Sequence, residues 1–316
     1  MILALAGGVG GAKLACGLTR VLAPEDLLIA VNTGDDFQHL GLHISPDLDS
    51  VMYKLAGLND VERGWGLAEE TWQFMTALRR LGGETWFNLG DQDLATHLER
   101  TRRLGRGETL SDVTRILCTK LGIEHPMVPM SDDAVRTMVI TDEGLLPFQD
   151  YFVRRKCEPV VTGFAFDGAE TARPNEALMS ALGDSNLDAV VICPSNPFVS
   201  IDPIFALRSV ASALENRTVP VVAISPIISG MAVKGPAAKM FGEMGMKPSA
   251  SAISRHYGDR IDGLIIDSCD AHLAGDIEET GTKVHIVPTL MKNTEDEQLL
   301  AKDVLAFAEA LKPRKS

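Results

Sequence analysis

The sequence has few aromatic residues, no closely spaced cysteine pair and no long hydrophobic run. Aromatic residues make up 5% of the 316 positions, and the five cysteines are scattered without a CxxC motif. Cys16, Cys193 and Cys269 lie in or beside apolar stretches, which favours reduced core thiols. No stretch approaches the roughly 18 apolar residues of a membrane span. The apolar start breaks at glycine without a preceding basic segment, so we expect a cytoplasmic protein with no membrane association.

Basic residues are also scarce relative to acidic ones. The chain has 30 Lys and Arg against 43 Asp and Glu, which gives a formal charge of −13. This balance argues against a nucleic-acid binder that neutralises phosphates. A hydrophobic content of 45% is typical of a globular protein. If the ligand is a phosphate ester, a local feature must attract it against the net charge.

Short apolar runs alternate with helical patterns over most of the chain. Runs suited to buried strands occupy 2–6, 27–32, 189–193, 219–225, 264–267 and 284–287. Helical spacing is found at 12–22, 47–55, 204–214, 236–244 and 295–311. This alternation predicts an α/β fold with a Rossmann-like, doubly wound and mostly parallel sheet.

The middle of the chain has a different pattern. Helical spacing at 69–81, 94–104 and 110–121 is followed by alternating, turn-rich sequence over 135–166 that suggests antiparallel strands. We therefore predict one α/β domain over 1–316, with a core at 1–60 and 185–311 and an inserted subdomain, helical and then β-rich, at about 61–184. The last residues, 312–316, are expected to form a frayed tail.

A glycine-rich turn follows the first predicted strand directly. In the sequence GGVGGAKL, Gly8 and Gly10 precede Lys13, which stands where the dinucleotide fingerprint requires glycine or alanine. The spacing of a P-loop is also absent. A strand, a glycine turn and a helix nevertheless direct backbone N–H groups toward a phosphate. The alternative is a tight turn that needs glycine for steric reasons alone.

Acidic side chains gather near three turns. The clusters are Asp35 with Asp36, Asp47 with Asp49, and Asp91 with Asp93. The first pair ends the second strand, at the edge where ligands bind in parallel sheets. Together the clusters suggest Mg²⁺ held by oxygen ligands beside a diphosphate. The alternatives are structural, with Asp47 as a helix N-cap and Asp49 as a partner of the helix dipole.

Two polar turns in the second half follow buried strands. One contains Ser195 and Asn196, and the other contains Ser225 and Gly230. Both belong to the carboxyl edge of the predicted sheet, so nucleotide contacts are a reasonable interpretation beside ordinary loop chemistry. The chain lacks a GxSxG nucleophile motif and an HExxH zinc motif.

Nine motifs in series resemble one family, the 2-phospho-L-lactate transferases (CofD family). In order they are GGVGGAKL, VNTGDDF, GLHISPDLDSVMY, ERGWGL, NLGDQDLATHL, PMSDDAVRTMV, FQDYFVRR, PSNPFVSIDPI and SPIISGMAVKGPAAK. The resemblance implies transfer of a phospholactyl-type group from a guanosine diphosphate donor to the deazaflavin Fo, with release of GMP, in the biosynthesis of coenzyme F-420. The resemblance also implies that the protein requires Mg²⁺ and forms a homodimer.

The resemblance also implies roles for individual residues. Diphosphate contacts fall on Gly8, Gly10, Gly11 and Lys13, and Mg²⁺ ligands on Asp35, Asp36, Asp47 and Asp49. Asp49, at the Fo site of the family, is the first choice for the catalytic carboxylate, with Asp36 as the second. Ser195, Asn196, Ser225 and Gly230 are candidates for guanosine and its phosphates, and Asn32, Asn88 and Asp91 complete the set of ligand contacts.

Two positions depart from the family pattern on the Fo side. Asn88 stands where relatives often have a basic residue, and Gln92 replaces the arginine of GDRD. The flat deazaflavin needs an apolar slot, to which Trp65, Trp86 and Phe87 are candidates to contribute, with core packing as the alternative role. The donor acid, whether phospholactate, phosphoenolpyruvate or phosphoglycerate derived, is left open.

Two other functions compete with this transferase. The first is a non-catalytic regulator that binds a nucleotide sugar, as in the CofD-like gluconeogenesis-factor proteins. These share the glycine turn but tend to lack the combination of GLHISPDLD and LGDxDLATH. The second is an NAD-dependent oxidoreductase, which Lys13 at the third fingerprint position disfavours.

Overall fold

Seven parallel strands form the central sheet of the molecule. The computed structural model describes residues 1–312, so the tail predicted at 312–316 lies outside the described residues except for Lys312. Across the sheet the strands are β14 (Lys283–Ile286), β13 (Gly263–Ile266), β10 (Val221–Ile224), β9 (Ala189–Ile192), β1 (Ile2–Ala6), β2 (Leu27–Val31) and β5 (Met127–Pro129). The predicted Rossmann-like, doubly wound α/β fold is confirmed.

The strand order reverses direction between β1 and β9. From β1 the chain proceeds outward to β2 and β5, and from β9 it proceeds the other way to β10, β13 and β14. The loops that follow β1 and β9 therefore diverge onto opposite sides of the sheet and leave a crevice at its carboxyl edge. This topology places the glycine turn and the Ser195–Asn196 turn side by side, which the register of β1 against β9 confirms.

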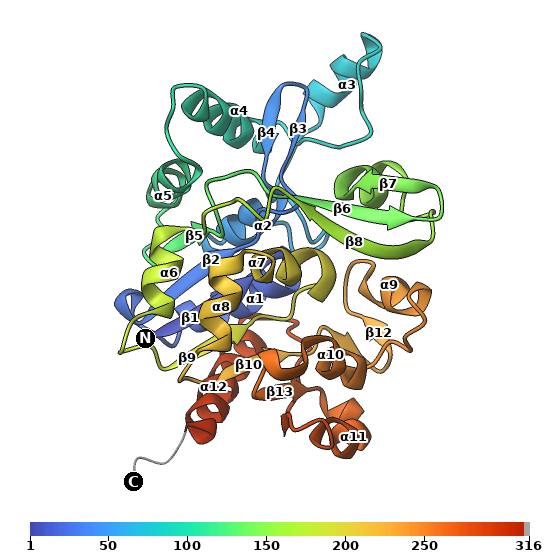
Figure 1. Ribbon diagram of the computed structural model, residues 1–316. Coiled ribbons are helices and arrows are strands. Elements are labelled where there is room, and N and C mark those ends of the chain that lie inside the picture. The colour runs from blue at the N-terminus through green and yellow to red at the C-terminus, as the bar shows by residue number, and fades with distance from the viewer. Residues whose placement is uncertain (313–316) are drawn as a thin grey trace.

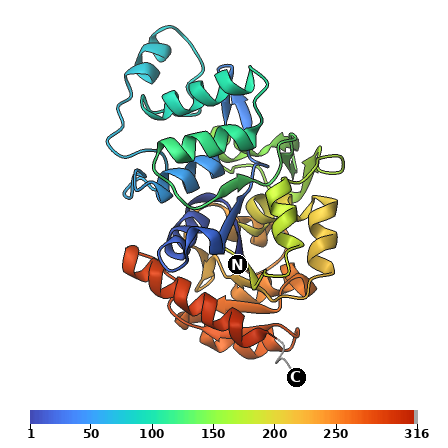
Figure 2. The same ribbon diagram turned by 90° about the vertical axis from the view of Figure 1, so that its left-hand side faces the viewer.

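Both faces of the sheet are buried, which explains why its strands are continuous apolar runs. In β1, Leu3 and Leu5 pack into one core cluster, and Ile2, Ala4 and Ala6 pack into the other. One face is covered by α1 (Gly8–Thr19), α2 (Pro46–Leu55), α5 (Leu110–Lys120) and α12 (Thr294–Leu311). The other is covered by α6 (Glu176–Leu182), α7 (Asp202–Phe205), α8 (Arg208–Glu215), α9 (Ala237–Glu243), α10 (Ala250–Tyr257) and α11 (Ala274–Glu278) (Figures 1 and 2).

Smaller elements surround the carboxyl edge of the sheet. They are the hairpin of β3 (Phe37–His39) and β4 (Leu42–Ile44), the helices α3 (Gln73–Arg80) and α4 (Asp93–Leu104), and the antiparallel sheet of β6 (Arg136–Thr141), β7 (Gly144–Pro147) and β8 (Val161–Asp167). The short pair β11 (Ile227–Ile228) and β12 (Met231–Ala232) follows β10. In Figure 1 these elements lie above and beside the strand ends.

Most predicted elements are present, and the differences have local causes. The strand β5 was missed because it has three residues and follows the helical stretch of the middle region. The single helix predicted at 204–214 is two helices, because the buried Leu207 between them has an extended backbone. Asp47 is not an N-cap, since α2 begins at Pro46 and Asp47 lies in its first turn. The division into core and insertion stays a prediction, although β5 of the inserted region pairs with the central sheet.

Among residues 1–312, no single helix is long and apolar enough to cross a membrane. One pair, Pro197–Phe205 with Arg208–Glu215, meets the length and composition criteria together but is bent by 85°.

The contact between α1 and α12 yields a stability prediction. A Cβ atom at Gly17 would collide with the backbone carbonyl oxygen of Glu297, so the two helices pack at a distance that only glycine permits. We expect Gly17→Ala to lower the free energy of unfolding by about 1–3 kcal/mol. Urea unfolding of the variant and the wild type would measure this difference in free energy. Gly242→Ala is the matched control, because Gly242 lies within α9 with nothing near its Cβ position, and it should not destabilise.

Candidate active site

The glycine turn and the turn after β9 approach each other so closely that Gly10 has no room for a side chain. A Cβ atom at Gly10 would collide with the carbonyl oxygen of Pro194, and Gly8 has a φ of +62°. The backbone N–H of Gly7 donates to Ser195 Oγ at 3.1 Å. Because α1 begins at Gly8, its N-terminus and free N–H groups face the crevice.

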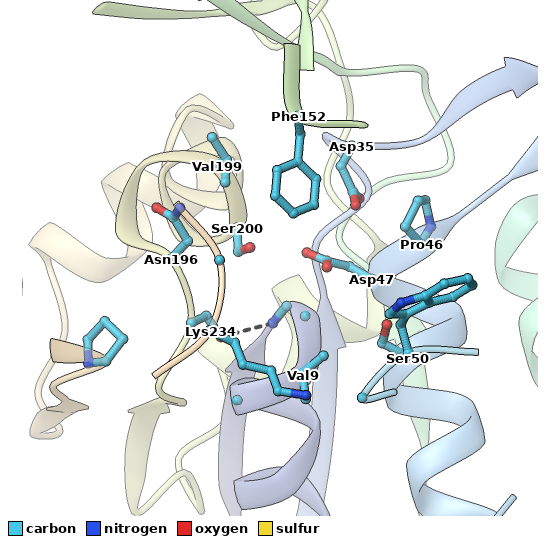
Figure 3. Close-up of a pocket in the computed structure, with 18 of the residues that line it drawn as sticks. Val9, Asp35, Pro46, Asp47, Ser50, Phe152, Asn196, Val199, Ser200 and Lys234 are labelled. Atoms are coloured by element: carbon cyan, nitrogen blue, oxygen red, sulfur yellow. Dashed lines mark hydrogen bonds between the residues drawn. The ribbon is translucent and has the colours of Figure 1, made fainter. Parts of the chain in front are cut away.

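A cavity of about 510 Å³ opens at this crevice. Of the fifteen residues proposed from sequence as catalytic, ligand-binding or metal-binding, the structure brings ten to its wall: Gly8, Gly10, Lys13, Asp35, Asp47, Asp49, Asn88, Ser195, Asn196 and Ser225. The remaining ones, Gly11, Asn32, Asp36, Asp91 and Gly230, do not line it. Figure 3 shows Asp35 and Asp47 directed toward the same space, between Ser200 and Pro46.

Asp35 and Asp47 form a buried pair of carboxylates. Asn32 Nδ2 donates to Asp47 Oδ2 at 2.9 Å and lies 3.5 Å from Asp35 Oδ1, and Gln149 Nε2 lies 3.4 Å from Asp35 Oδ2. Within residues 1–312, neither carboxylate has an ion pair with a basic side chain. Burial raises the pKa of Asp47 to about 6, and burial together with repulsion from Asp47 raises the pKa of Asp35 well above its usual value. The pair therefore needs a proton or a cation.

Asp36 is adjacent in sequence but has a different environment. Its Oδ2 accepts from Ser45 Oγ at 2.8 Å and lies 2.9 Å from His43 Nε2. These contacts tie the end of β2 to the β3–β4 hairpin, and the carboxylate is buried away from the cavity. Asp36 therefore lies outside the cavity wall, although the sequence analysis proposed it as a metal ligand and a catalytic carboxylate.

Asp49 has a cationic partner that the sequence did not suggest. The two terminal guanidinium nitrogens of Arg100, Nη1 and Nη2, donate to its carboxylate oxygens, Nη1 at 3.1 Å. His97 Nδ1 lies 3.6 Å from Asp49 Oδ2, and its Nε2 lies 3.3 Å from Asp93 Oδ2, which belongs to the same helix. Tyr53 completes the network by donating to Asp93 Oδ1 at 2.5 Å. Burial raises the pKa of Asp49, and Arg100 opposes this shift.

Lys13 is turned toward the last segment of the chain. Its Nζ donates to the carbonyl oxygen of Met291 at 2.6 Å, and burial lowers its pKa. Lys234 reaches toward Val9 of the glycine turn (Figure 3). A Cβ atom at Gly64 would collide with Lys234 Nζ, so the loops that carry Gly64 and Lys234 meet at the cavity.

Aromatic side chains form the apolar part of the wall. Trp65 and Phe87, two of the three candidates from sequence, line the cavity, whereas Trp86 packs against Phe37 and does not. Phe148 and Phe152, which the sequence did not suggest, lie stacked with ring centroids 5.4 Å apart. Phe152 belongs to a π-helical turn at Asp150–Arg154, a rare conformation that is frequent at functional sites.

The remaining candidates have structural contacts. Asp91 accepts from the backbone N–H groups of Gln73 and Phe74, each at 3.0 Å, and thereby caps α3. Gly230 lies in the turn between β11 and β12 with a φ of +76°, where glycine is favoured. Cavity residues that sequence reasoning did not single out include Ser200, Gln149 and Arg63, which stand within the motifs PSNPFVSIDPI, FQDYFVRR and ERGWGL but were assigned no role.

An open parallel sheet with a glycine-rich turn and a cavity at its switch point is typical of Rossmann-like α/β proteins that bind phosphate-bearing ligands. Within this class, the family model described as "2-phospho-L-lactate transferase CofD" matches residues 2–302. The chain belongs to the CofD family of transferases, and the predicted family membership is confirmed.

Curated relatives match over nearly the whole chain. A phosphoenolpyruvate transferase of Kitasatospora aureofaciens is 40% identical over 318 aligned positions, which cover 98% of each protein. One of Mycobacterium tuberculosis is 39% identical and covers 91% of this chain and 92% of the relative. Among solved structures, a UPF0052 family member from Bacillus halodurans has a TM-score of 0.63 at 13% identity, with 96% and 98% of the two chains covered. That likeness concerns the fold alone.

The environments of Asp47 and Asp36 predict opposite effects of the same substitution. A folded-state pKa of about 6 for Asp47, above the unfolded value near 4, means that stability falls as the pH rises between these values and stays reduced above them. We therefore expect Asp47→Asn to stabilise the metal-free protein at pH 7.5 by about 1–2 kcal/mol.

This gain should largely disappear near pH 4, where the carboxyl group is protonated in the folded state and about half protonated in the unfolded state. Urea unfolding with a chelator at the two pH values measures it. The matched control, Asp36→Asn, disturbs the contacts with Ser45 and His43 and should destabilise at pH 7.5. Equal loss of stability in both variants would show that the charge on Asp47 carries no penalty.

Proposed function

We propose that this transferase moves a phosphoenolpyruvyl group from a guanosine diphosphate-linked donor to the deazaflavin Fo, releasing GMP and forming the precursor of coenzyme F-420. The observation that carries the proposal is one cavity that combines a glycine turn, a carboxylate pair without a basic partner and an aromatic wall. Family membership supports the class of reaction. The names of the relatives that are 36–40% identical favour enolpyruvyl over lactyl and glyceryl donors.

The donor would bind across the switch point. The N–H groups at the start of α1 suit its diphosphate, because they lie at the crevice beside the carboxylate of Asp47, where a bound cation would attract phosphate. Ser195, Asn196 and Ser225 form the turns on the other side, and their side chains stabilise these turns. Asn196 accepts from Phe198 N at 3.1 Å, and Ser225 Oγ donates to the carbonyl oxygen of Ile227 at 2.8 Å. Backbone groups of these turns would then contact guanosine.

The residues present fit Mg²⁺ at Asp35 and Asp47. Two buried carboxylates with raised pKa values and no basic partner among residues 1–312 form an oxygen-rich, electron-rich site, which suits this cation. Asn32 holds the pair together from behind. When bound, Mg²⁺ would neutralise the diphosphate and the charge that develops during transfer.

The acceptor would lie on the Asp49 side of the cavity, with its ring system against Trp65, Phe87 and Phe152. The terminal hydroxyl of its ribityl chain attacks the phosphorus that carries the enolpyruvyl group. A new O–P bond forms, the bond to the GMP oxygen breaks, and GMP leaves with the electron pair. Asp49 accepts the hydroxyl proton. Such a transfer depends chiefly on in-line positioning and charge stabilisation.

We further propose that the protein acts as a cytoplasmic homodimer, as the family resemblance implies. Sedimentation analysis would test the oligomeric state.

Product analysis tests the proposed reaction directly. With Fo, Mg²⁺ and the enolpyruvyl donor, mass spectrometry should detect the phosphoenolpyruvyl deazaflavin and equimolar GMP. The lactyl and glyceryl donors should react more slowly, and a chelator should abolish turnover. Absence of product with all three donors would refute the transferase, and tight binding of a nucleotide sugar would then favour the non-catalytic regulator.

The role of Asp49 is tested by removing its charge. We expect Asp49→Asn to lower kcat by about 100-fold or more, because an amide cannot accept the hydroxyl proton. Its unfolding transition should still be cooperative, since an amide of the same shape retains one acceptor for Arg100. Wild-type turnover in this variant would show that Asp49 is not the proton acceptor.

A further inference from the structure

The most deeply buried cation near the cavity is the guanidinium of Arg100. Arg100 belongs to α4, is 2% exposed and makes both of its strongest contacts with the carboxylate of Asp49 on α2. Two longer contacts follow: Arg100 Nη1 lies 3.3 Å from His97 Nδ1 and donates to the carbonyl oxygen of His43 at 3.5 Å. Burying an arginine is unfavourable unless its partner is well placed, so this pair is a specific feature of the site.

The two members of the pair differ in their access to ligands. Asp49 lines the cavity, together with Tyr53, Asp93 and His97 of the same network, whereas Arg100 does not. The guanidinium therefore approaches the carboxylate from behind. A bidentate contact uses one lone pair on each oxygen, and the others remain available to a donor in the cavity. Asp49 is thus presented as an acceptor in one fixed orientation.

The same geometry distinguishes Asp49 from the other carboxylates. A guanidinium in direct contact repels a divalent cation, while Asp35 and Asp47 have no such partner among residues 1–312. Building on the proposed function, we propose that Arg100 is a positioning residue that holds Asp49 as a fixed hydroxyl acceptor for Fo and reserves the cation for Asp35 and Asp47. Arg100 then acts through Asp49 and contacts neither substrate.

A double-mutant cycle on acceptor binding tests this role. The dissociation constant of Fo, measured by its fluorescence in metal-free protein without donor, isolates the acceptor side of the site. Arg100→Lys keeps a positive charge but removes the planar fork, and we expect it to weaken Fo binding about tenfold. In an Asp49→Asn background, Arg100→Lys should weaken Fo binding less than about twofold, because the carboxylate that Arg100 orients is already absent. Affinity for GDP should be unchanged in all variants.

Two further variants keep the test decisive. Arg102→Lys alters an exposed pair with Glu99 on the same helix and should bind Fo like the wild type. The double variant Asp49→Asn/Arg100→Gln leaves no unpaired charge, so it should fold even if Arg100→Lys does not, and it should bind Fo no more weakly than Asp49→Asn.

The outcomes separate the two proposals. An equal loss of affinity from Arg100→Lys in both backgrounds would overturn the positioning role, because a structural effect does not depend on Asp49. Weaker binding by the double variant than by Asp49→Asn would overturn it too. Failure of the wild type to bind Fo at all would overturn the proposed function and the positioning role with it.

Discussion

The site depends on the close approach of two backbone turns at the switch point of the sheet. Gly10 lies against the carbonyl group of Pro194, and Gly7 donates to Ser195 Oγ, so the turns after β1 and β9 are fixed to each other. The helix α1 begins at Gly8, so its N-terminus lies at the crevice, next to the side chains of Asp47 and Ser200. The cavity follows from this contact, since the remaining walls are attached to strands whose positions the sheet determines.

The second constraint is electrostatic, and it divides four neighbouring aspartates by their partners. Asp36 is bound by Ser45 and His43, and Asp49 is bound by Arg100. Asp35 and Asp47 have no basic partner among residues 1–312, and both contact the side-chain amide of Asn32. Four carboxylates that look equivalent in sequence therefore have different chemistry, because each charge buried from water must be balanced by whatever the fold places next to it.

This division also shows how far the sequence predicts the structure. Buried parallel strands are recognisable as apolar runs, and the motifs after β1, β2, β9 and β10 could be assigned to one edge because parallel topology brings those ends together. Arg100 could not be found in this way. It is 51 positions from Asp49, on a helix whose other arginines form surface pairs with Glu99 and Glu108, so only the packing of α4 against β4 reveals its partner. The strand β5 could not be predicted from sequence for the same reason, because it is recognisable only by its pairing with β2 in the folded sheet.

The aromatic wall extends this argument to the inserted region. Trp65, Phe87 and Phe152 come from segments between 61 and 184, whereas the glycine turn and the Ser195 turn belong to the sheet. If the donor binds to the sheet and the acceptor to the inserted segments, the two substrates are recognised by separate parts of the chain that meet at Asp35, Asp47 and Asp49. The net charge of −13 is then no obstacle to an anionic donor. A cation at the unpaired carboxylates would make this edge attractive to a diphosphate, while Arg100, which lies behind Asp49 and does not line the cavity, keeps Asp49 available to a neutral hydroxyl group.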